Sequence, residues 1–396
     1  MISVEQATAR IVAAFSPLEC ETVPLKKAAG RVLANDTVAS VDQPPFAVSA
    51  MDGYAVRAAD VAHAPVTLRV IGTAPAGHPF EGRVAPGEAV RLFTGSVTPA
   101  GADTIVIQEN TDCGTSEVTV NTGSPSDRHI RPAGLDFRKG DVLARAGKRL
   151  TARDLALLAA ADFGKVDVHR RPRILLAATG DELSIPGAPR KPSGIVASSL
   201  YSLEALIARW GGETINLDIL PDRIDSVAKI ADCSPEVDLA VTLGGASVGE
   251  HDLVQRALGP KGFTLDFWKI AMRPGKPLIF GHLGATPLLG LPGNPVSSYV
   301  CALLFLKPAI AAMMGSTDEQ PFTTARMTSD LAANDSRQDY VRARLFRRDG
   351  ELWVEPMPLQ DSSMQKVLSE ADCLVVRAPH APAAAAGDAV TVLPLE

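Results

Sequence analysis

The sequence predicts a multidomain α/β protein in which a central doubly wound sheet domain is accompanied by two smaller β-rich domains. Strand-like and helix-like segments alternate from Arg173 to the apolar helix after Pro295. Short β-rich runs separated by glycine and proline fill the stretch from Val38 to Asp141, and strand-like runs return after Gly315. The alternation is typical of a parallel sheet covered by helices, whereas short strands between turns are typical of small β domains. A chain of 396 residues accommodates roughly two to four such domains.

The N-terminal part of the chain is predicted to form two units. Ser3 and Gln6 have the spacing of a capping box at the start of a first helix. The runs VTLRVIG, AVRLF, TIVIQE and EVTV predict strands of an inserted β-rich domain, residues 39–140. The run ARDLALLAAAD predicts a helix beyond that insertion. We therefore expect residues 1–38 plus 141–170 to form one discontinuous linker domain.

The rest of the chain predicts a central α/β domain, residues 171–316, and a C-terminal β domain, residues 317–396. Strands are expected at RILLAA, TINLDIL, DLAVTL, LIFG and TPLLG, with helices at SLYSLEALIARW and RIDSVAKIAD. The run Val296–Met314 approaches the length of a membrane span. Lys307 and Pro308 interrupt it and no aromatic belt flanks it, so we expect a buried core helix.

Composition excludes several classes of function. The chain has 39 basic and 45 acidic residues, a net charge of −6, which disfavours a nucleic-acid-binding protein. Five widely spaced cysteines without a C-x-x-C pair disfavour a disulfide framework and a zinc knuckle. Glu5 and Arg10 lie within the N-terminal apolar pattern, and no cleavage site for a signal peptide follows. We therefore expect a cytoplasmic protein without nucleic-acid or membrane partners.

Three loops at the ends of apolar strands are the candidate ligand site. In a doubly wound sheet, ligands bind at the carboxyl ends of the strands, and glycines there let a ligand approach the backbone. An ordinary strand-to-helix turn is the alternative for each loop alone, but three loops at one sheet edge favour an oxyanion site. The three loops contain Thr179, Gly180, Asp181 and Glu182; Gly244, Gly245, Ser247, Gly249 and Asp252; and Pro292, Gly293, Asn294 and Pro295.

A basic stretch and several acids suggest how an anion would be held. Lys269, Arg273 and Lys276 lie within eight residues with no acid between them, which suits a phosphate or another tetrahedral dianion. A solvated basic loop is the alternative. Asp181, Glu182 and Asp252 on the glycine loops would suit Mg²⁺, which prefers oxygen ligands, and surface acids are the alternative for them.

The segment VDQPPFAVSAMDGYA, residues 41–55, is expected to be rigid and to carry several polar side chains. Two prolines stiffen it, while Ser49, Asp52 and Tyr54 stand among small residues. A rigid entry turn into the β-rich domain and a ligand site both fit this pattern.

Seven segments in order resemble the molybdopterin molybdenumtransferases, the MoeA family that includes the E domain of gephyrin. They are PPFAVSAMDGYA, RLFTGSVTPAGADTIVIQE, IRPAGLDFRKGD, TGDEL, GGASVGEHD, MRPGKP and LPGNPVSS, within a match over residues 3–380. The resemblance implies an elongated four-domain homodimer whose central domain binds molybdopterin and whose discontinuous N-terminal unit serves dimerisation. It also implies a Mg²⁺-dependent insertion of molybdenum from molybdate into adenylylated molybdopterin, with release of AMP.

The resemblance and the pattern of the three glycine loops together assign roles to particular residues. Catalysis would involve Asp52, Glu182, Asp222 and Asp252, with Mg²⁺ held by Glu182, Asp252 and Asp181. Substrate and anion binding would involve Thr94, Asp136, Thr179, Gly180, Ser247, Lys269, Arg273, Lys276, Pro292, Asn294 and Pro295, together with Arg344 and Ser363, which match the family motifs less closely. The position of Asp52 in the inserted domain leads us to expect a site completed across the dimer interface. Ser199 stands where the family's asparagine is expected, and Ala246 replaces a branched residue.

Two other functions fit parts of the sequence. A molybdopterin adenylyltransferase would use the glycine loops but does not require the two additional β domains. A noncatalytic scaffold would be expected to lose the acids and bases of the loops, which are all present here. The sequence leaves open whether molybdate or tungstate is used, because both have the same shape and charge. For the transferase we expect the upstream adenylyltransferase and the recipient molybdoenzymes as further partners.

Overall fold

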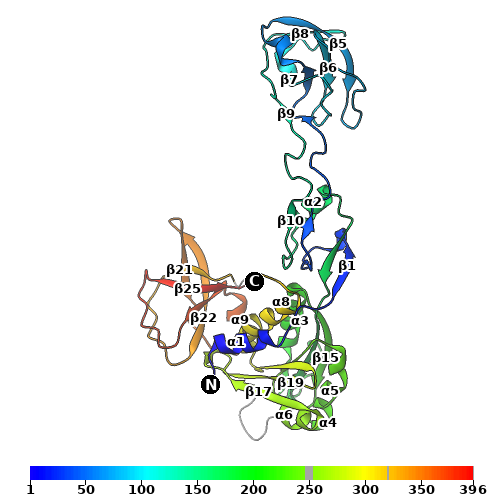
Figure 1. The fold of residues 1–396 in the computed structure, drawn as a ribbon. Helices are drawn as coiled ribbons and strands as arrows, with labels where there is room; N and C mark the ends of the chain where they lie inside the picture. The colour runs from blue at the N-terminus through cyan, green and yellow to red at the C-terminus, as the bar shows by residue number, and fades with distance from the viewer. Residues whose placement is uncertain (246–252, 319–320, 396) are drawn as a thin grey trace.

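A computed structural model describes residues 1–245, 253–318 and 321–395 of the chain, which form an elongated molecule (Figure 1). The inserted β domain occupies one end. A narrow middle unit connects it to the central α/β domain, and the C-terminal β domain lies beside the central domain (Figure 1).

A six-stranded sheet forms the central domain, in the order β15-β12-β16-β20-β19-β17. The first four of these strands are parallel, which confirms the doubly wound prediction. β19 is antiparallel to its neighbours because only a tight turn at Gly284 separates it from β20. The strand bounds are β12 Arg173–Thr179, β15 Glu213–Leu220, β16 Leu239–Leu243, β17 Phe263–Lys269, β19 Pro277–Leu283 and β20 Thr286–Leu291. A two-stranded pair, β13 Leu183–Ser184 and β14 Ile195–Val196, lies after β12.

Helices bury both faces of this sheet. Ile174, Leu176 and Ala178 of β12 belong to one hydrophobic core, whereas Leu175 and Ala177 belong to the other. This alternation follows from the two-residue period of a strand. The first core is covered by α1 Val4–Ala13, α3 Ser198–Trp210, α7 Pro295–Cys301 and α8 Lys307–Met313, and the second by α4 Ile224–Val227, α5 Lys229–Cys233 and α6 Leu253–Leu258.

The apolar run near residue 300 is a core helix, as predicted. A π-helical turn, Ala302–Leu306, connects α7 and α8 into one helix from Pro295 to Met313. Its length and apolar composition alone would suit a membrane span, but 72% of its most apolar window is buried inside the protein. The turn lies just before Pro308, which lacks an N–H and cannot sit in an ordinary α-helical ladder.

The middle unit is built from two separated segments. β1 Cys20–Pro24 pairs with β11 Lys165–His169, and β2 Thr37–Val38 pairs with β10 Val142–Ala144. α2 Ala152–Ala160 begins with a capping box from Thr151 and Asp154. The first helix differs from expectation: α1 has the predicted Ser3–Gln6 capping box, but its apolar face packs into the central core against α8.

The inserted domain is a five-stranded sheet in the order β7-β4-β6-β5-β8, with a two-stranded pair, β3 and β9, beside it. Two hydrophobic clusters fill it, one on each side of β4. The strand bounds are β3 Val48–Ser49, β4 Gly53–Val56, β5 Val66–Ala74, β6 Glu88–Leu92, β7 Thr104–Ile107, β8 Glu117–Val120 and β9 Ile130–Arg131.

The C-terminal domain is a β-barrel, because β22 pairs with both β23 and β24 and thereby closes the sheet. A short strand from the central domain, β18 Met272–Arg273, adds to the barrel in parallel with β22. The remaining bounds are β21 Thr323–Met327, β22 Gln338–Arg348, β23 Glu351–Pro356, α9 Gln365–Ser369, β24 Cys373–Arg377 and β25 Ala389–Pro394.

Candidate functional site

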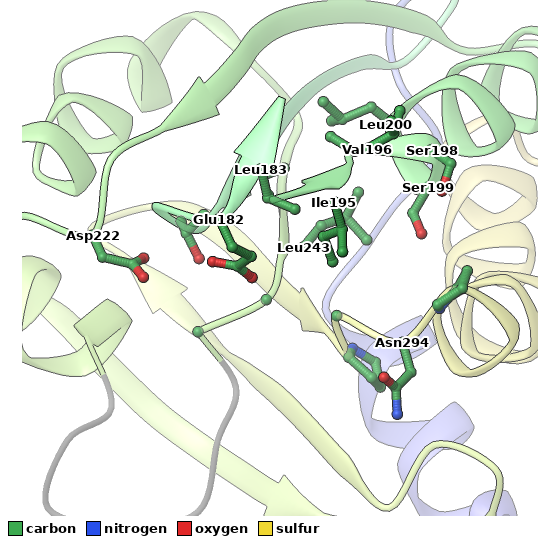
Figure 2. A pocket seen from close by; sticks show the side chains of 18 of the residues that line it. Glu182, Leu183, Ile195, Val196, Ser198, Ser199, Leu200, Asp222, Leu243 and Asn294 are labelled. Atoms are coloured by element: carbon green, nitrogen blue, oxygen red, sulfur yellow. The ribbon is translucent and has the colours of Figure 1, made fainter. Parts of the chain in front are cut away.

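A cleft of about 1090 Å³ opens at the carboxyl ends of β12, β16 and β20. These strands are neighbours in the sheet, so the three loops predicted from the sequence meet there. Of the predicted residues, those lining the cleft are Thr179, Glu182, Asp222, Gly244, Gly245, Pro292, Gly293, Asn294, Pro295 and Ser363 (Figure 2). Ser247, Gly249 and Asp252, and the substitution at Ala246, lie outside the described residues.

Glycine lets the first two loops approach each other closely. Gly244 has a φ of +83°, and a Cβ atom placed on it would lie 2.8 Å from the carbonyl oxygen of Thr179. A side chain at this position would therefore strain the backbone and push the loops after β12 and β16 apart. The close approach brings backbone groups of both loops to the floor of the cleft.

Two of the predicted carboxylates, Glu182 and Asp222, line one end of the cleft, and Asp181 lies beside them without lining it. The backbone N–H of Asp222 donates to Asp181 Oδ1 at 3.2 Å, and that of Asp181 donates to Asp222 Oδ2 at 3.4 Å. Glu182 and Asp222 line the cleft together (Figure 2). Desolvation of its carboxyl group, followed by the charges of Asp181 and Glu182, raises the pKa of Asp222. The site thus concentrates negative charge that a bound cation would relieve.

The donor set fits Mg²⁺ as an ion shared with a substrate. Within residues 1–245, 253–318 and 321–395, no three His, Cys, Asp or Glu side chains converge into a ready metal cage. Mg²⁺ commonly binds through one or two carboxylates, several waters and substrate phosphates. Glu182 and Asp222 are the described carboxylates that line the cleft and could act in this way.

One wall of the cleft comes from the C-terminal barrel. Ser363 and Gln365 line the cleft, and Gln365 Nε2 donates to Ser198 Oγ at the start of α3 at 2.5 Å. Asn294 Nδ2 donates to Ser362 Oγ at 2.9 Å. These hydrogen bonds attach the segment before α9 to the third glycine loop, and the first residue of α9 to the start of α3.

The hydroxyl of Ser199, at the position where an asparagine was expected, points toward the core helix α7. Ser298 Oγ donates to Ser199 Oγ at 3.2 Å, and both residues are buried. Ser199 still lines the cleft beside Ser198 (Figure 2).

The basic stretch is not the uncompensated charge that its sequence suggested. Arg273 forms ion pairs with Asp339 and, at 3.5 Å, with Asp335, both from the C-terminal domain. Sequence spacing missed these acids because they come from a segment more than 60 residues away. The ammonium of Lys269 lies 3.6 Å from the centre of the Trp268 ring, and Lys276 is exposed. None of the three lines the cleft, to which this stretch contributes only Pro277.

Arg344 also lies away from the cleft, paired with Glu370 at 3.1 Å. Arg342, two residues earlier, is 2% exposed and supports the loop before Ser363. Its Nε donates to Gln360 Oε1 at 3.2 Å, and its Nη1 donates to the Asp361 carbonyl at 2.8 Å.

Asp52 and Thr94 belong to the inserted domain, which lies at the opposite end of the molecule from the central domain (Figure 1), and Asp136 lies in the segment between β9 and β10 that connects the inserted domain to the middle unit. Asp52 Oδ1 accepts hydrogen bonds from the backbone N–H of Thr94 at 2.7 Å and from its hydroxyl at 2.8 Å. These bonds, the backbone one first, lower the pKa of Asp52. Asp136 is exposed, and its N–H donates to the Gln43 carbonyl at 2.9 Å. Within one chain, these residues do not meet the cleft.

Sequence reasoning missed two cationic side chains of the cleft, Arg190 and Arg256. Arg190 lies between the glycines of GAPRKPSG, and Arg256 follows the second glycine loop on α6. Their position after two of the three glycine loops was the available signal. Anion binding was instead predicted for the basic stretch at 269–276, because its basic residues are closer together.

Comparison with known proteins covers nearly the whole chain. Residues 2–161 match the MoeA N-terminal region (domain I and II), residues 176–312 a probable molybdopterin binding domain, and residues 324–395 the MoeA C-terminal region (domain IV). A "Molybdopterin molybdenumtransferase" of Haemophilus influenzae is 32% identical over 100% of this chain and 98% of its own length. The chain belongs to the MoeA family.

Other MoeA relatives agree with this membership. A "Molybdopterin molybdenumtransferase" of Nostoc sp. is 36% identical over 85% of this chain and 79% of its own length. The crystal structure of a molybdopterin biosynthesis MoeA protein from Pyrococcus horikoshii OT3 superposes with a TM-score of 0.86. It is 26% identical and covers 100% of both chains. The N-terminal domains, the central α/β domain and the C-terminal β-barrel described above are thus those of the MoeA fold.

Proposed function

We propose that this MoeA protein inserts molybdenum from molybdate into adenylylated molybdopterin, with release of AMP in a Mg²⁺-dependent step. The observation that carries the proposal is the cleft itself. It combines a carboxylate cluster with three glycine loops in a chain related along its full length to molybdopterin molybdenumtransferases. A pterin nucleotide offers a diphosphate to the loops and an extended body to a cleft of this size.

In this proposal the residues of the cleft position the nucleotide. Glu182 and Asp222 would hold Mg²⁺, which supplies charge neutralisation for the diphosphate while the bond to AMP breaks. Gly244 and Gly245 let the backbone approach the nucleotide. Asn294 and Ser363 orient it from the opposite wall, and their segments are fixed by the Asn294–Ser362 hydrogen bond.

We further propose that the active enzyme is a homodimer in which the inserted domain of one subunit reaches the cleft of its partner. Phe46, Leu135 and Met51 are large apolar side chains that are 62%, 58% and 40% exposed. They lie near Asp52 and Asp136, and backbone bonds join the two segments: Gly134 to Pro44 and Asp136 to Gln43. Exposed apolar side chains grouped in this way are typical of an interaction surface. A two-fold axis would bury this surface twice and complete two equivalent sites.

The proposal places the enzyme in the cytoplasm, after a reaction that adenylylates molybdopterin and before the enzymes that receive the finished cofactor. It uses no nucleic-acid or membrane partner.

AMP release separates this function from the alternatives. The purified protein, given adenylylated molybdopterin, Mg²⁺ and molybdate, should release AMP, and Glu182→Gln should abolish the release without lowering the thermal unfolding temperature. An adenylyltransferase would instead consume ATP and molybdopterin in the absence of molybdate. A scaffold would give no product in either assay, and either of these results would overturn the proposal.

A further inference from the structure

We infer that Arg190 and Arg256 bind the diphosphate of the pterin nucleotide. This inference rests on the proposed function, which it deepens by naming the groups that hold the phosphates.

Arg190 is held against the acidic end of the cleft by its own loop. The segment between β13 and β14 folds back onto the loop after β12, where the ammonium of Lys191 donates to the Asp181 carbonyl at 2.7 Å. The N–H of Ile195 donates to the Glu182 carbonyl at 2.9 Å. Both bonds hold the segment that follows Arg190 against the loop after β12, and Arg190 itself lines the cleft.

Arg256 reaches the cleft from a different element. Val254, Ala257 and Leu258 bury one face of α6 in the second core. This packing fixes the helix and leaves Arg256 exposed, in the lining of the cleft with Leu253 and the glycines after β16. Arg190 thus reaches the cleft from the chain that follows β12, and Arg256 reaches it from the helix that follows β16.

Neither guanidinium is neutralised by the part of the protein that the structure describes. Over residues 1–245, 253–318 and 321–395, neither Arg190 nor Arg256 has an ion pair or a side-chain hydrogen bond. By contrast, Arg273 and Arg344, which lie off the cleft, are paired with acids. Two cations that have no partner among the described residues share the cleft with Glu182 and Asp222, which matches a substrate that binds Mg²⁺ on one side and offers phosphate oxygens on the other.

A diphosphate suits this arrangement better than a single tetrahedral anion. Arginines on two separate elements can each contact one phosphate, and a guanidinium fork binds two phosphate oxygens at once. A cleft of about 1090 Å³ also has room for the groups on both sides of the diphosphate. Molybdate, with one tetrahedral centre, would not require both arginines.

Binding of inorganic pyrophosphate in the presence of Mg²⁺ tests the assignment directly. We would compare the wild-type full-length chain with Arg190→Gln, Arg256→Gln and Arg256→Lys by titration calorimetry. Lys261→Gln serves as the control, because Lys261 is an exposed cation near the end of α6 that does not line the cleft. Thermal unfolding of each variant would show that it is folded.

The expected result is that each glutamine variant weakens pyrophosphate binding by roughly 10- to 100-fold, the range for one charge-assisted contact. Arg256→Lys should lose less, because it keeps the charge but not the fork. Lys261→Gln should bind as wild type does, and molybdate binding should be unchanged in all variants. Unchanged pyrophosphate binding in both glutamine variants, no binding by the wild type, or a selective loss of molybdate binding would each overturn the inference.

The AMP-release assay distinguishes failure of this inference from failure of the proposed function. In one outcome the wild type releases AMP and both glutamine variants have the same KM for the pterin nucleotide as the wild type. The arginines are then not phosphate ligands, and the proposed function stands. If wild type releases no AMP while the variants still lose pyrophosphate binding, the function fails and the anion site stands.

Discussion

At the scale of single residues, the cleft brings carboxylates of like charge together at one end. Asp181, Glu182 and Asp222 come from two loops, and the backbone bonds between Asp181 and Asp222 hold those loops together. Desolvation of its carboxyl group, and then the like charges of Asp181 and Glu182, disfavour ionisation of Asp222 and raise its pKa. Perturbed acids of this kind are concentrated at functional sites, where a bound cation stabilises them.

Asp222→Asn should therefore make the metal-free protein more stable at neutral pH. Because the pKa of Asp222 is raised in the folded state, the native protein binds its proton more tightly than the unfolded chain does. The free energy of unfolding then falls as pH rises from the unfolded pKa through the folded one, and the loss persists above it. The variant should show its gain at pH 7 and lose it under acidic conditions, as measured by denaturant unfolding across pH.

Asp225→Asn is the matched control for this experiment. Pairing with Arg223, whose Nη2 lies 2.7 Å from Asp225 Oδ2, lowers the pKa of Asp225, so this variant should not gain stability at pH 7. Equal gains in both variants would show that the effect is not specific to the cluster.

Residue roles were only partly predictable from the sequence. Glu182 and Asn294 line the cleft as expected, because glycine-rich loops after strands are a local pattern, whereas only the family resemblance pointed to Ser363, which also lines it. The state of Arg273 could not be foreseen, since its partner acids come from another domain. Arg190 and Arg256 follow two different glycine loops, and only the folded chain brings them to the same cleft.

At the scale of elements, the cleft depends on how tightly the β12 and β16 loops pack. Gly244→Ala would place a methyl group 2.8 Å from the Thr179 carbonyl at a φ of +83°. We expect it to destabilise the protein by about 1–3 kcal/mol and to weaken nucleotide binding, because strained φ angles and overpacking have costs of this order. Chemical denaturation and nucleotide titration would measure the two effects.

Gly284→Ala separates backbone strain from close approach. Gly284 has a φ of +62° but no atom within 4 Å of its added Cβ, and it lies in the turn between β19 and β20. This control should lose some stability and keep nucleotide affinity. If Gly244→Ala bound nucleotide as tightly as Gly284→Ala does, the packing of these loops would not shape the site.

Elements were the most predictable level of the structure. Alternating strands and helices predicted the doubly wound sheet, and a parallel sheet places the ends of β12, β16 and β20 at one edge. The location of α1 was harder to predict from the sequence. Its capping box and amphipathic pattern predict a helix, but they do not show which core its apolar face joins. Barrel closure by the β22–β24 pairing likewise depends on contacts between strands distant in sequence.

At the scale of the whole molecule, the separation of Asp52 from the cleft is the feature that a single chain does not explain (Figure 1). In the proposed homodimer, each site would combine the inserted domain of one subunit with the cleft of the other. Mixing inactive Asp52→Ala with inactive Glu182→Ala chains, after dissociation and reassociation, should then restore activity. Random pairing makes half of the dimers mixed, each with one intact site, so roughly a quarter of wild-type activity should return.

Subunit exchange must be verified in that experiment, for example by mass-labelling one variant. Exchange without recovered activity would place Asp52 in its own subunit's site or outside any site.

Binding of adenylylated molybdopterin in the cleft is the claim on which the function depends, and native mass spectrometry tests it most directly. The wild-type protein and a Ser198→Trp variant, which would place an indole ring in the cleft at the start of α3, would each be mixed with the pterin nucleotide and Mg²⁺ without molybdate. We predict one retained nucleotide per wild-type chain and none in the variant, with both proteins folded. A wild-type chain that retains no nucleotide, or a variant that retains as much as wild type, would contradict this account.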